Sequence, residues 1–330
     1  MVLIISEEDD LSTQVVIDWL VHFKKDFTRI NNSDKVRVRG IKITNDSLDF
    51  EILGKGLLTY SLLSSEIKSF WYRRGEMNLD IDTEFDFIVN EQGLSEGISA
   101  YLYEEKVFLQ SAIYKCIESV AASTVDNFQT TINRKFESLL LAKKVGLKIP
   151  ATAIVQSIEE LNFFVANHGP DIVTKGINEN IRILTKESYI CSPTVSLNPK
   201  DLGDASQCFF PTLIQKKIAK EFDVRVFYIK GKAFAAAIFT SNKYKDEVDF
   251  RVVSRIDDRL LRIIPYSLDE ITIDQLNSFM KIMGRDSGSF DLVQSSDGQL
   301  YFLEMNPVGQ FGFLSDACNY YIERYIAKNL

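Results

Sequence analysis

Histidine and cysteine are scarce in this sequence of 330 residues, which contains two of the first and four of the second. The cysteines show no CxxC spacing and have no companion histidines, so the sequence argues against a structural zinc site and a disulfide scaffold. We expect reduced, mostly buried thiols instead. The same scarcity leaves no Ser–His or Cys–His constellation, so catalysis through a protein nucleophile is not expected either. The cysteines are Cys116, Cys191, Cys208 and Cys318, and the histidines are His22 and His168.

Long apolar runs and an excess of basic residues are also missing. No stretch approaches the roughly 20 apolar residues that a membrane-spanning helix needs. The short apolar run Val2–Ile5 is followed by acidic Glu7–Asp10, whereas a signal peptide has a basic flank. A net charge of −8 argues against a broad nucleic-acid-binding surface. We therefore expect a cytoplasmic protein whose partners include neither membranes nor nucleic acids.

The chain is long enough, and apolar enough at 45% hydrophobic residues, to bury a large core in two or three subdomains. Strand patterns and amphipathic helical patterns both occur, which predicts an α/β (α+β) protein. In the N-terminal part we predict a buried parallel strand over residues 2–6, a helix over 11–23 capped by Ser12, half-buried strands over 36–39 and 48–53, and two helices over 84–105 and 107–122.

The strongest local pattern is a hairpin near the C-terminus. Two apolar runs flank Asp297-Gly298, the dipeptide that most favours a two-residue turn with positive φ. With those two residues as the turn, Ser296 faces Gln299, and Val293 faces Phe302 further along the ladder. The same strand register sets which polar side chains lie opposite each other at the end of the hairpin far from the turn.

Three oxygen-bearing side chains meet at that far end. Asp291 lies opposite Glu304, and Asn306 shares their face because side chains alternate along a strand. Hard oxygen ligands on a rigid hairpin suit Mg²⁺, which usually completes its shell with water and substrate phosphates. A solvated acidic patch on an edge hairpin is the alternative, and spacing alone leaves both open. The Gly/Pro loop Pro307–Gly312 just past these residues favours the metal site.

This stretch resembles the metal-binding end of the ATP-grasp ligases. The run Glu304-Met-Asn-Pro-Val-Gly-Gln-Phe-Gly312, followed by Cys318-Asn-Tyr-Tyr321, is similar more narrowly to the ATP-grasp maturases of ribosomally made peptides, the graspetide group related to the microviridin ligases. The resemblance implies an ATP-grasp fold of three subdomains with an N-terminal pre-ATP-grasp domain. These would be the N-terminal domain at residues 1–122, the central subdomain with lid and leader-peptide contact at 123–210, and the C-terminal subdomain with the metal site at 211–330.

The resemblance also implies a nucleotide site, in which the three hairpin residues would hold Mg²⁺, as two ions, together with ATP. Lys135, near the start of an amphipathic helix, and Lys175, at the end of an apolar strand, would contact the phosphates. Without the resemblance Lys135 is an ordinary surface lysine, whereas a lysine at the end of a buried strand is unusual in itself. The hinge between the lobes would border the adenine with Gln215, Lys216, Lys217 and Ile218, and Glu221 or Asp223 would accept hydrogen bonds from the ribose hydroxyls.

Two arginines are expected at the reacting phosphate. Arg225 shares a strand face with Asp223, and Arg251 resembles the arginine that family members place against the acyl phosphate, so both would stabilise transferred charge. An Asp–Arg pair on a solvated sheet face is the alternative for Arg225. The run Trp-Tyr-Arg73-Arg74 resembles the N-terminal domain of the maturases, which makes its arginines candidates for contacting a carboxylate or phosphate; a solvated strand end is the alternative.

One segment departs from the wider superfamily. Many ATP-grasp enzymes have a Gly-rich lid loop whose amides cradle phosphate, whereas this chain has Asn178–Lys186 at that position. Either the lid would then be looser, or charged side chains such as Arg182 would replace those amides. The family also implies a leader-peptide site, and we place it near Ile177–Tyr189.

The implied function is ATP-dependent activation of Asp or Glu side chains of a precursor peptide as acyl phosphates. The precursor would consist of a leader and a core, and a Ser or Thr hydroxyl or a Lys amine of the core would displace phosphate to close an ω-ester or ω-amide macrocycle. The resemblance also admits a homodimer. Two alternatives remain: a RimK-like or glutathione-synthase-like ligase that joins separate molecules, and a non-catalytic nucleotide-binding regulator. The complete set of metal ligands argues against the regulator.

Overall fold

The computed structural model describes residues 1–55, 59–81, 92–128, 135–177, 182–184, 189–191, 194–198, 208–244, 247–248 and 250–330. The chain divides into two compact units, Met1–Thr131 with Tyr321–Leu330, and Ile132–Tyr320. The C-terminal residues therefore belong to the same unit as the N-terminal ones. The predicted division at residues 122/123 and 210/211 remains a prediction.

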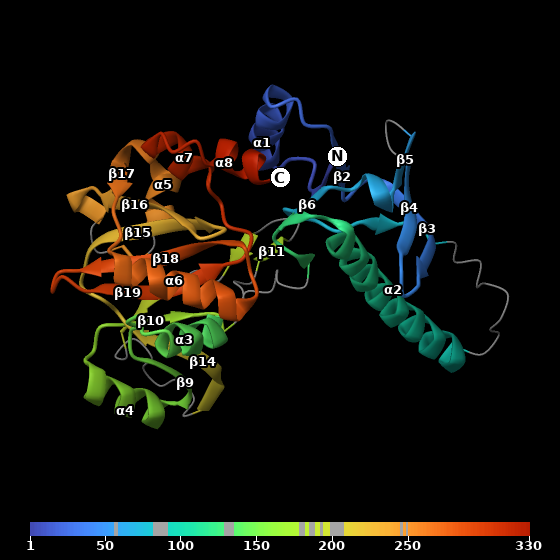
Figure 1. The fold of residues 1–330 in the computed structure, drawn as a ribbon. Helices are drawn as coiled ribbons and strands as arrows, with labels where there is room; N and C mark the ends of the chain where they lie inside the picture. The colour runs from blue at the N-terminus through green and yellow to red at the C-terminus, as the bar shows by residue number, and fades with distance from the viewer. Residues whose placement is uncertain are drawn as a thin grey trace. The chain divides into compact units, whose positions relative to one another are not determined.

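The first unit contains a four-stranded parallel sheet. Its strands are β1 (Val2–Ser6), β2 (Phe27–Asn31), β6 (Ser69–Tyr72) and β8 (Ser123–Val125), in the order β2-β1-β6-β8. All residues of β1 are buried, as expected for a central parallel strand, so the predicted strand over residues 2–6 is confirmed. Helix α1 (Leu11–His22) follows β1, and α8 (Ile322–Asn329) packs against α1 (Figure 1).

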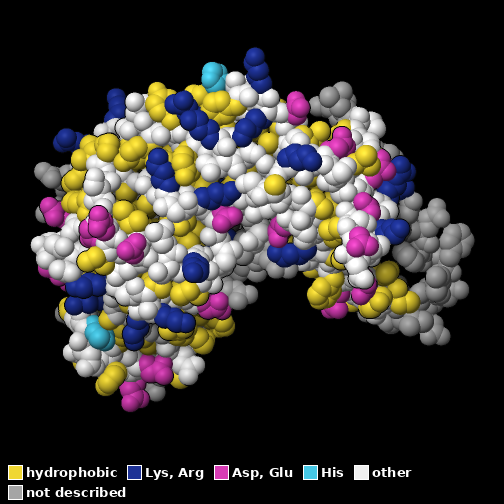
Figure 2. All heavy atoms as spheres, viewed as in Figure 1, with side chains coloured by type: hydrophobic (Ala, Val, Ile, Leu, Met, Phe, Trp, Pro, Cys, Tyr) yellow, Lys and Arg dark blue, Asp and Glu magenta, His cyan; other side chains and the backbone are white. Residues whose placement is uncertain are grey.

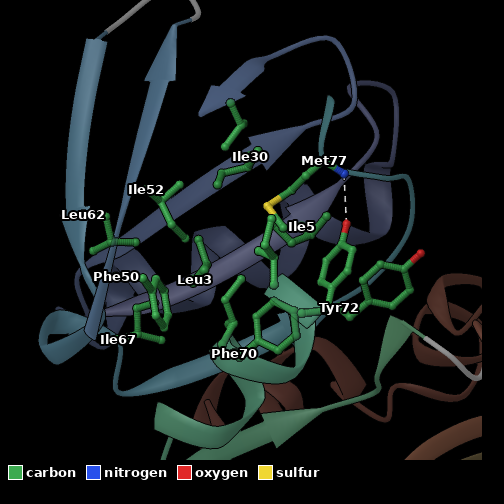
Figure 3. Close-up of a cluster of buried hydrophobic side chains, with 14 of the residues drawn as sticks. Leu3, Ile5, Ile30, Phe50, Ile52, Leu62, Ile67, Phe70, Tyr72 and Met77 are labelled. Carbon is green, nitrogen blue, oxygen red and sulfur yellow. Dashed lines mark hydrogen bonds between the residues drawn. The ribbon is translucent and has the colours of Figure 1, made fainter. Parts of the chain in front are cut away.

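A second sheet completes the core of this unit. Its strands are β3 (Lys35–Ile43), β4 (Leu48–Lys55), β5 (Thr59–Leu63) and β7 (Asn78–Leu79), in the order β5-β4-β3-β7, and η1 (Ser64–Glu66) follows β5. The strands predicted over residues 36–39 and 48–53 are thereby confirmed. Leu3 and Ile5 of β1 pack with Ile52 of β4 in one apolar cluster, where the Tyr114 hydroxyl accepts a hydrogen bond from the Met77 N–H at 2.9 Å (Figure 3).

Two local predictions for this unit are wrong. The N-cap of α1 is Asp10, whose carboxylate accepts a hydrogen bond from the Ser12 N–H, so Ser12 lies within the first turn. Asp and Ser are both favoured N-cap residues, so residue type alone does not distinguish position 10 from position 12. A single helix, α2 (Gln92–Val120), runs through the break predicted at Lys106, because no Gly or Pro interrupts it there. Residues 84–91 of the predicted helix lie outside the described segments.

Arg73, directly after β6, is a buried part of this unit. Its Nε lies 2.9 Å from Asp10 Oδ2, and the two side chains are 2% and 5% exposed. Thr13 Oγ1 donates to the same carboxylate at 3.0 Å. A solvated strand end is therefore the wrong interpretation for Arg73, whose ion pair joins the end of β6 to the start of α1.

The Asp10–Arg73 pair should make the first unit sensitive to acid. Burial by itself raises the Asp10 pKa, but Arg73 and Thr13 hold it below its ordinary value. A carboxyl group with a lowered folded-state pKa stabilises the fold above its unfolded-state pKa, and this contribution is lost as the pH falls through the folded-state pKa. We expect Asp10→Asn, which retains a capping side chain, to destabilise the unit at neutral pH, and the difference from the wild type to shrink below about pH 4.

Tryptophan fluorescence during urea unfolding measures this effect, because both tryptophans of the chain, Trp19 and Trp71, lie in the first unit. A destabilisation by Asp10→Asn that stays constant from pH 7 to pH 3 would show that the ionised carboxylate contributes nothing.

The second unit is built on a five-stranded antiparallel sheet. Its strands are β15 (Lys220–Ile229), β16 (Lys232–Thr240), β17 (Leu261–Tyr266), β18 (Ser287–Ser295) and β19 (Leu300–Asn306), in the order β17-β16-β15-β18-β19. Helices α3 (Lys135–Lys144) and α6 (Glu270–Met283) bury one face of this sheet through residues such as Leu139 and Phe279, which pack on Val224 and Phe290. The other helical elements of this part of the unit are η4 (Asn242–Tyr244), α5 (Phe250–Ile256), η5 (Asp258–Leu260) and α7 (Gly312–Cys318).

A smaller antiparallel sheet completes the second unit. Its strands are β9 (Thr152–Ser157), β10 (Ile172–Lys175), β13 (Val195–Leu197) and β14 (Cys208–Lys216), in the order β13-β10-β14-β9, and α4 (Ile158–His168) packs against β9. Strands β11 (Arg182–Leu184) and β12 (Tyr189–Cys191) pair with each other. In the view of Figure 2, acidic and basic side chains are interspersed on the surface of both units. Among the described helices, none has the length and apolar character to span a bilayer.

Candidate functional site

The β18–β19 hairpin pairs Asp291 with Glu304 as predicted, but its turn and the ladder next to the turn differ from the prediction. The turn closes with Ser295 bonded to Gln299, and Gly298 has φ +79°, which is the geometry of a three-residue loop with a left-handed glycine. Near the turn the ladder is therefore offset by one residue from the prediction. A bulge at Leu303 restores the offset before Asp291 is reached.

The predicted pairing of Val293 with Phe302 is consequently wrong. Val293 lies opposite Tyr301, and Phe302 lies opposite Leu292. The bulge has a second effect, because Leu303 lines the cavity described below. A backbone irregularity thus sets both the register at the polar end of the hairpin and one apolar wall beside it.

The polar end of the hairpin brings the three predicted metal ligands together. Asn306 Nδ2 lies 3.3 Å from Asp291 Oδ2 and 3.2 Å from Glu304 Oε1, so both carboxylates converge on one amide. A half-turn of that amide would exchange its nitrogen for its oxygen and complete a set of hard oxygen ligands. No three His, Cys, Asp or Glu side chains of the described segments form a metal-binding group. An ion held here would therefore take two carboxylates, one amide oxygen and further oxygens from substrate or water.

Both predicted arginines contact Asp291. Arg225 of β15 lies across the ladder from Asp291 and forms a buried ion pair with it. Arg251 Nη2 lies 3.1 Å from Asp291 Oδ2 and 3.7 Å from Glu304 Oε1, and its side chain is 49% exposed. Burial alone raises the pKa of Asp291, but the two guanidinium groups hold it below its usual range. The solvated-face alternative for Arg225 is thus wrong, because its side chain is 8% exposed.

A cavity of about 340 Å³ lies beside these carboxylates, within the second unit. It is bounded by the ends of β10 and β14, the start of β15, the β18–β19 hairpin and α5. Most of the predicted site residues meet on its wall. They are Lys175, Gln215, Lys216, Lys217, Ile218, Asp223, Arg251, Asp291 and Glu304.

Lys175 is a buried cation facing the two carboxylates. Its residue is 8% exposed, and burial lowers the pKa of its ammonium group, while Glu304 opposes this shift. Lys135, the first residue of α3, is 6% exposed and adds positive charge near Lys175. Lys135 is therefore not a surface lysine. Lys175, Arg225 and Arg251 thus lie around one pair of carboxylates, with Lys135 close to Lys175. This arrangement suits an anionic ligand held with a cation.

Glu221 is separated from the other predicted residues. Lys220 pairs with Ser295 and Phe222 with Gln294, so a bulge in β15 leaves Glu221 outside the ladder. Glu221 lines a different cavity together with Phe222. Of the two residues proposed for the ribose, only Asp223 borders the 340 Å³ cavity.

Lys220 is a residue of this cavity that the sequence analysis missed. Its Nζ lies 2.8 Å from Asp223 Oδ2 and 3.4 Å from the Val248 carbonyl oxygen, and the side chains of the ion pair are each 11% exposed. The sequence could have indicated this ion pair. A lysine three residues before an aspartate at the start of a buried strand is costly to bury unless the two charges pair. The predicted lid over residues 178–186 and leader contact over 177–189 lie mostly outside the segments that the structure describes.

The loop Pro307–Gly312 is held against β18 beside the carboxylates. A Cβ atom on Gly309 would overlap the Ser289 hydroxyl and lie 2.7 Å from the Ser289 backbone nitrogen. Because the backbone itself is in the way, no rotamer of Ser289 can relieve the overlap. Only glycine fits at position 309.

Gly309→Ala should therefore lower the free energy of unfolding of the second unit by about 1–3 kcal/mol, the cost of an overpacked site. It should also weaken the nucleotide binding that the sequence resemblance implies, because Ser289 is two residues from Asp291. Gly312→Ala is the matched control, since its Cβ meets no atom within 4 Å. Thermal unfolding and ADP titration of both variants measure the two effects, and equal behaviour of the two variants would contradict this account.

Comparisons with solved structures identify the fold. The chain is similar to a Chryseobacterium gregarium RiPP-associated ATP-grasp ligase in complex with ADP and a leader and core peptide, with a TM-score of 0.73, 22% identity, and coverage of 99% of this chain and 94% of that one. It is also similar to the macrocyclase MdnC from Microcystis aeruginosa bound with precursor peptide MdnA, with a TM-score of 0.73, 24% identity, and coverage of 99% and 98%.

A more distant likeness is to a RimK domain ATP-grasp protein from Sphaerobacter thermophilus, with a TM-score of 0.53, 10% identity, and coverage of 100% of this chain and 98% of that one. No protein-family model matches the sequence, and no curated protein matches it. The likenesses extend over the whole chain, so the predicted fold is confirmed: this protein has the α/β fold of the ATP-grasp ligases.

Proposed function

We propose that this protein is an ATP-dependent carboxylate ligase that closes ω-ester or ω-amide macrocycles within a ribosomally made precursor peptide. The observation that carries the proposal is the convergence of Lys175, the hinge residues 215–218 and Asp223 with Asp291 and Glu304 on one cavity. The similar structures were solved with ADP and with leader, core or precursor peptides.

In this proposal the hinge residues border the adenine and Asp223 accepts from the ribose. Lys175 and Lys135 neutralise the phosphates of ATP. Asp291, Glu304 and Asn306 hold magnesium, which when bound would offset the phosphate charge. Their oxygen-rich donor set and the surrounding cations fit Mg²⁺–ATP.

The chemistry follows from positioning and charge alone. A substrate carboxylate oxygen attacks the γ-phosphorus of ATP, the bond to ADP breaks, and an acyl phosphate results. A hydroxyl or amine of the same peptide then attacks the acyl carbon, phosphate leaves, and the nucleophile loses a proton. Arg225 and Arg251 stabilise the negative charge that the transferring phosphoryl group carries. A protein nucleophile has no part in either step.

Three finer elements of the proposal rest on the sequence alone. They are two magnesium ions rather than one, a homodimer, and a cytoplasmic location. The likeness to the RimK domain protein supports a second candidate, a ligase that joins separate molecules through the same activation step.

A mass spectrum of a candidate precursor after incubation with the protein, ATP and Mg²⁺ distinguishes these functions. The precursor would be a short peptide rich in Thr, Ser, Asp and Glu, encoded beside this gene. Loss of one water per cross-link, dependent on ATP, is the expected result. An added mass would identify an intermolecular ligase instead. An unchanged peptide without ATP hydrolysis would leave a non-catalytic nucleotide-binding regulator.

A further inference from the structure

A second cavity of the second unit lies across the β18–β19 hairpin from the candidate active site. It has a volume of about 490 Å³, comparable to the clefts that hold small ligands. Leu292 borders both cavities, whereas Asp291 and Glu304 line only the first and Phe302 only the second. The hairpin therefore lies between the two spaces.

The floor of this second cavity is aromatic and its rim is acidic. The Phe222 and Tyr266 rings meet edge to face with centroids 5.8 Å apart. Glu221 and Asp269 bring carboxylates to the rim, and the Asp269 carboxylate also caps α6. Lys148 also lines the cavity, but its Nζ donates to Gln299. In the part of the chain that the structure describes, neither carboxylate has an ion-pair partner.

Three glutamine side chains around the rim are already oriented. Gln275 Nε2 donates to the Gly146 carbonyl at 2.9 Å, Gln294 Oε1 accepts from Tyr266 at 3.3 Å, and Gln299 Oε1 accepts from Lys148. Each amide is held through one end, and its other end carries a further donor or acceptor. One acceptor and two donors, each fixed in place, match the N–H and C=O groups of a peptide backbone.

The acidic rim depends on the bulge in β15. In a regular strand Glu221 would share the face of Asp223 and turn towards the first cavity. The extra residue between Lys220 and Phe222 turns Glu221 to the same side as Phe222 instead. The carboxylate and the aromatic floor are thus brought together by a backbone irregularity.

We propose that this cavity is a docking site for a peptide segment, which inserts one lysine or arginine side chain. The cationic group would lie over the Phe222 and Tyr266 rings and between Glu221 and Asp269, since aromatic faces and carboxylates both attract cations. The glutamine amides would bond to the peptide backbone on either side of the inserted residue. This site is distinct from the catalytic one and does not depend on the proposed ligase activity.

The probe for this proposal is N-acetyl-arginine amide, titrated into the ¹⁵N-labelled full-length protein. Saturable shifts of the Gly146 and Gly298 amides, which lie on the cavity wall, are expected. N-acetyl-norleucine amide has a similar length without the charge, and N-acetyl-glutamate amide has the opposite charge. Saturation by either of these at the same concentration as the arginine probe, or no saturation by the arginine probe, would overturn the proposal.

A pair of variants tests the acidic rim. Glu221→Gln together with Asp269→Asn removes both charges while asparagine keeps the helix cap, and should raise the dissociation constant of the arginine probe by roughly tenfold. Glu270→Gln, one residue away and not on the cavity wall, removes a charge from the same helix end and should change it less than about twofold. Equal losses in both proteins would mean that net charge, not the cavity, attracts the probe, and would refute the site. Unchanged thermal unfolding of the double variant shows that the loss is not caused by misfolding.

Discussion

Replacing Glu304 by glutamine should lower the proposed macrocyclisation, and the ATP turnover that drives it, by about 10³-fold, with little change in stability. The carboxylate of Glu304 converges with Asp291 on Asn306, and we propose that the three hold the metal that offsets the phosphate charge. Glutamine has the same shape but no charge, so it cannot stabilise the charge that develops as the phosphoryl group is transferred, and loss of one such group costs about 10²–10³ or more in rate. A magnesium titration should show a weakened metal dependence in the variant.

Asp297→Asn is the matched control for this experiment. It removes one negative charge from the tip of the same hairpin, where Asp297 is fully exposed, and asparagine also suits the turn. Wild-type turnover is expected for the control. Wild-type turnover in Glu304→Gln would remove the proposed metal site, whatever the substrate of the protein.

Replacing Arg225 by alanine should destabilise the second unit by about 3 kcal/mol as well as abolish turnover, because a buried carboxylate loses its buried partner. Arg225 and Asp291 are 8% and 11% exposed, and Arg251 remains as the only other cation that contacts Asp291 through a described ion pair. Arg251→Ala should lower turnover similarly but cost less than about 1 kcal/mol in stability, since Arg251 is half exposed. Thermal and urea unfolding, measured beside turnover, separate the two effects.

A double replacement sharpens this comparison. Arg225→Met with Asp291→Leu substitutes an apolar pair for the buried ion pair, which is often neutral or stabilising. We expect it to recover most of the stability that Arg225→Ala loses while remaining inactive. If Arg225→Ala were as stable as Arg251→Ala, the buried ion pair would have no structural role.

The hairpin illustrates how a sequence can predict a residue pairing correctly for an incomplete reason. The dipeptide Asp297-Gly298 marks the turn, and alternation pairs Asp291 with Glu304. The turn is nevertheless one residue longer than predicted, and the bulge at Leu303 compensates. Local propensity cannot reveal this compensation, because a bulge is selected by the packing of the whole sheet rather than by its own residue.

Glu221 and Asp223 illustrate the opposite outcome. Their spacing by two predicts one shared face, but the bulge in β15 turns them to different cavities. The buried ion pair of Arg73 could not be predicted from neighbouring residues either, because its partner Asp10 lies far away in the sequence, next to a different element. In both cases the side chain's position depends on a contact between segments that are far apart in the sequence.

The sequence by itself determined the α/β class, the buried parallel strand β1, the composition of the hairpin and the residue types able to hold magnesium and phosphate. These depend on periodicity and side-chain chemistry, which are local properties. Only the tertiary structure decided that Lys135 and Lys175 are buried together near the carboxylates, that Lys220 holds Asp223, and that Glu221 faces a second cavity. Those outcomes depend on which strands pair and which side chains become buried. A buried charge is costly unless it is paired, and its partner often comes from a distant part of the chain.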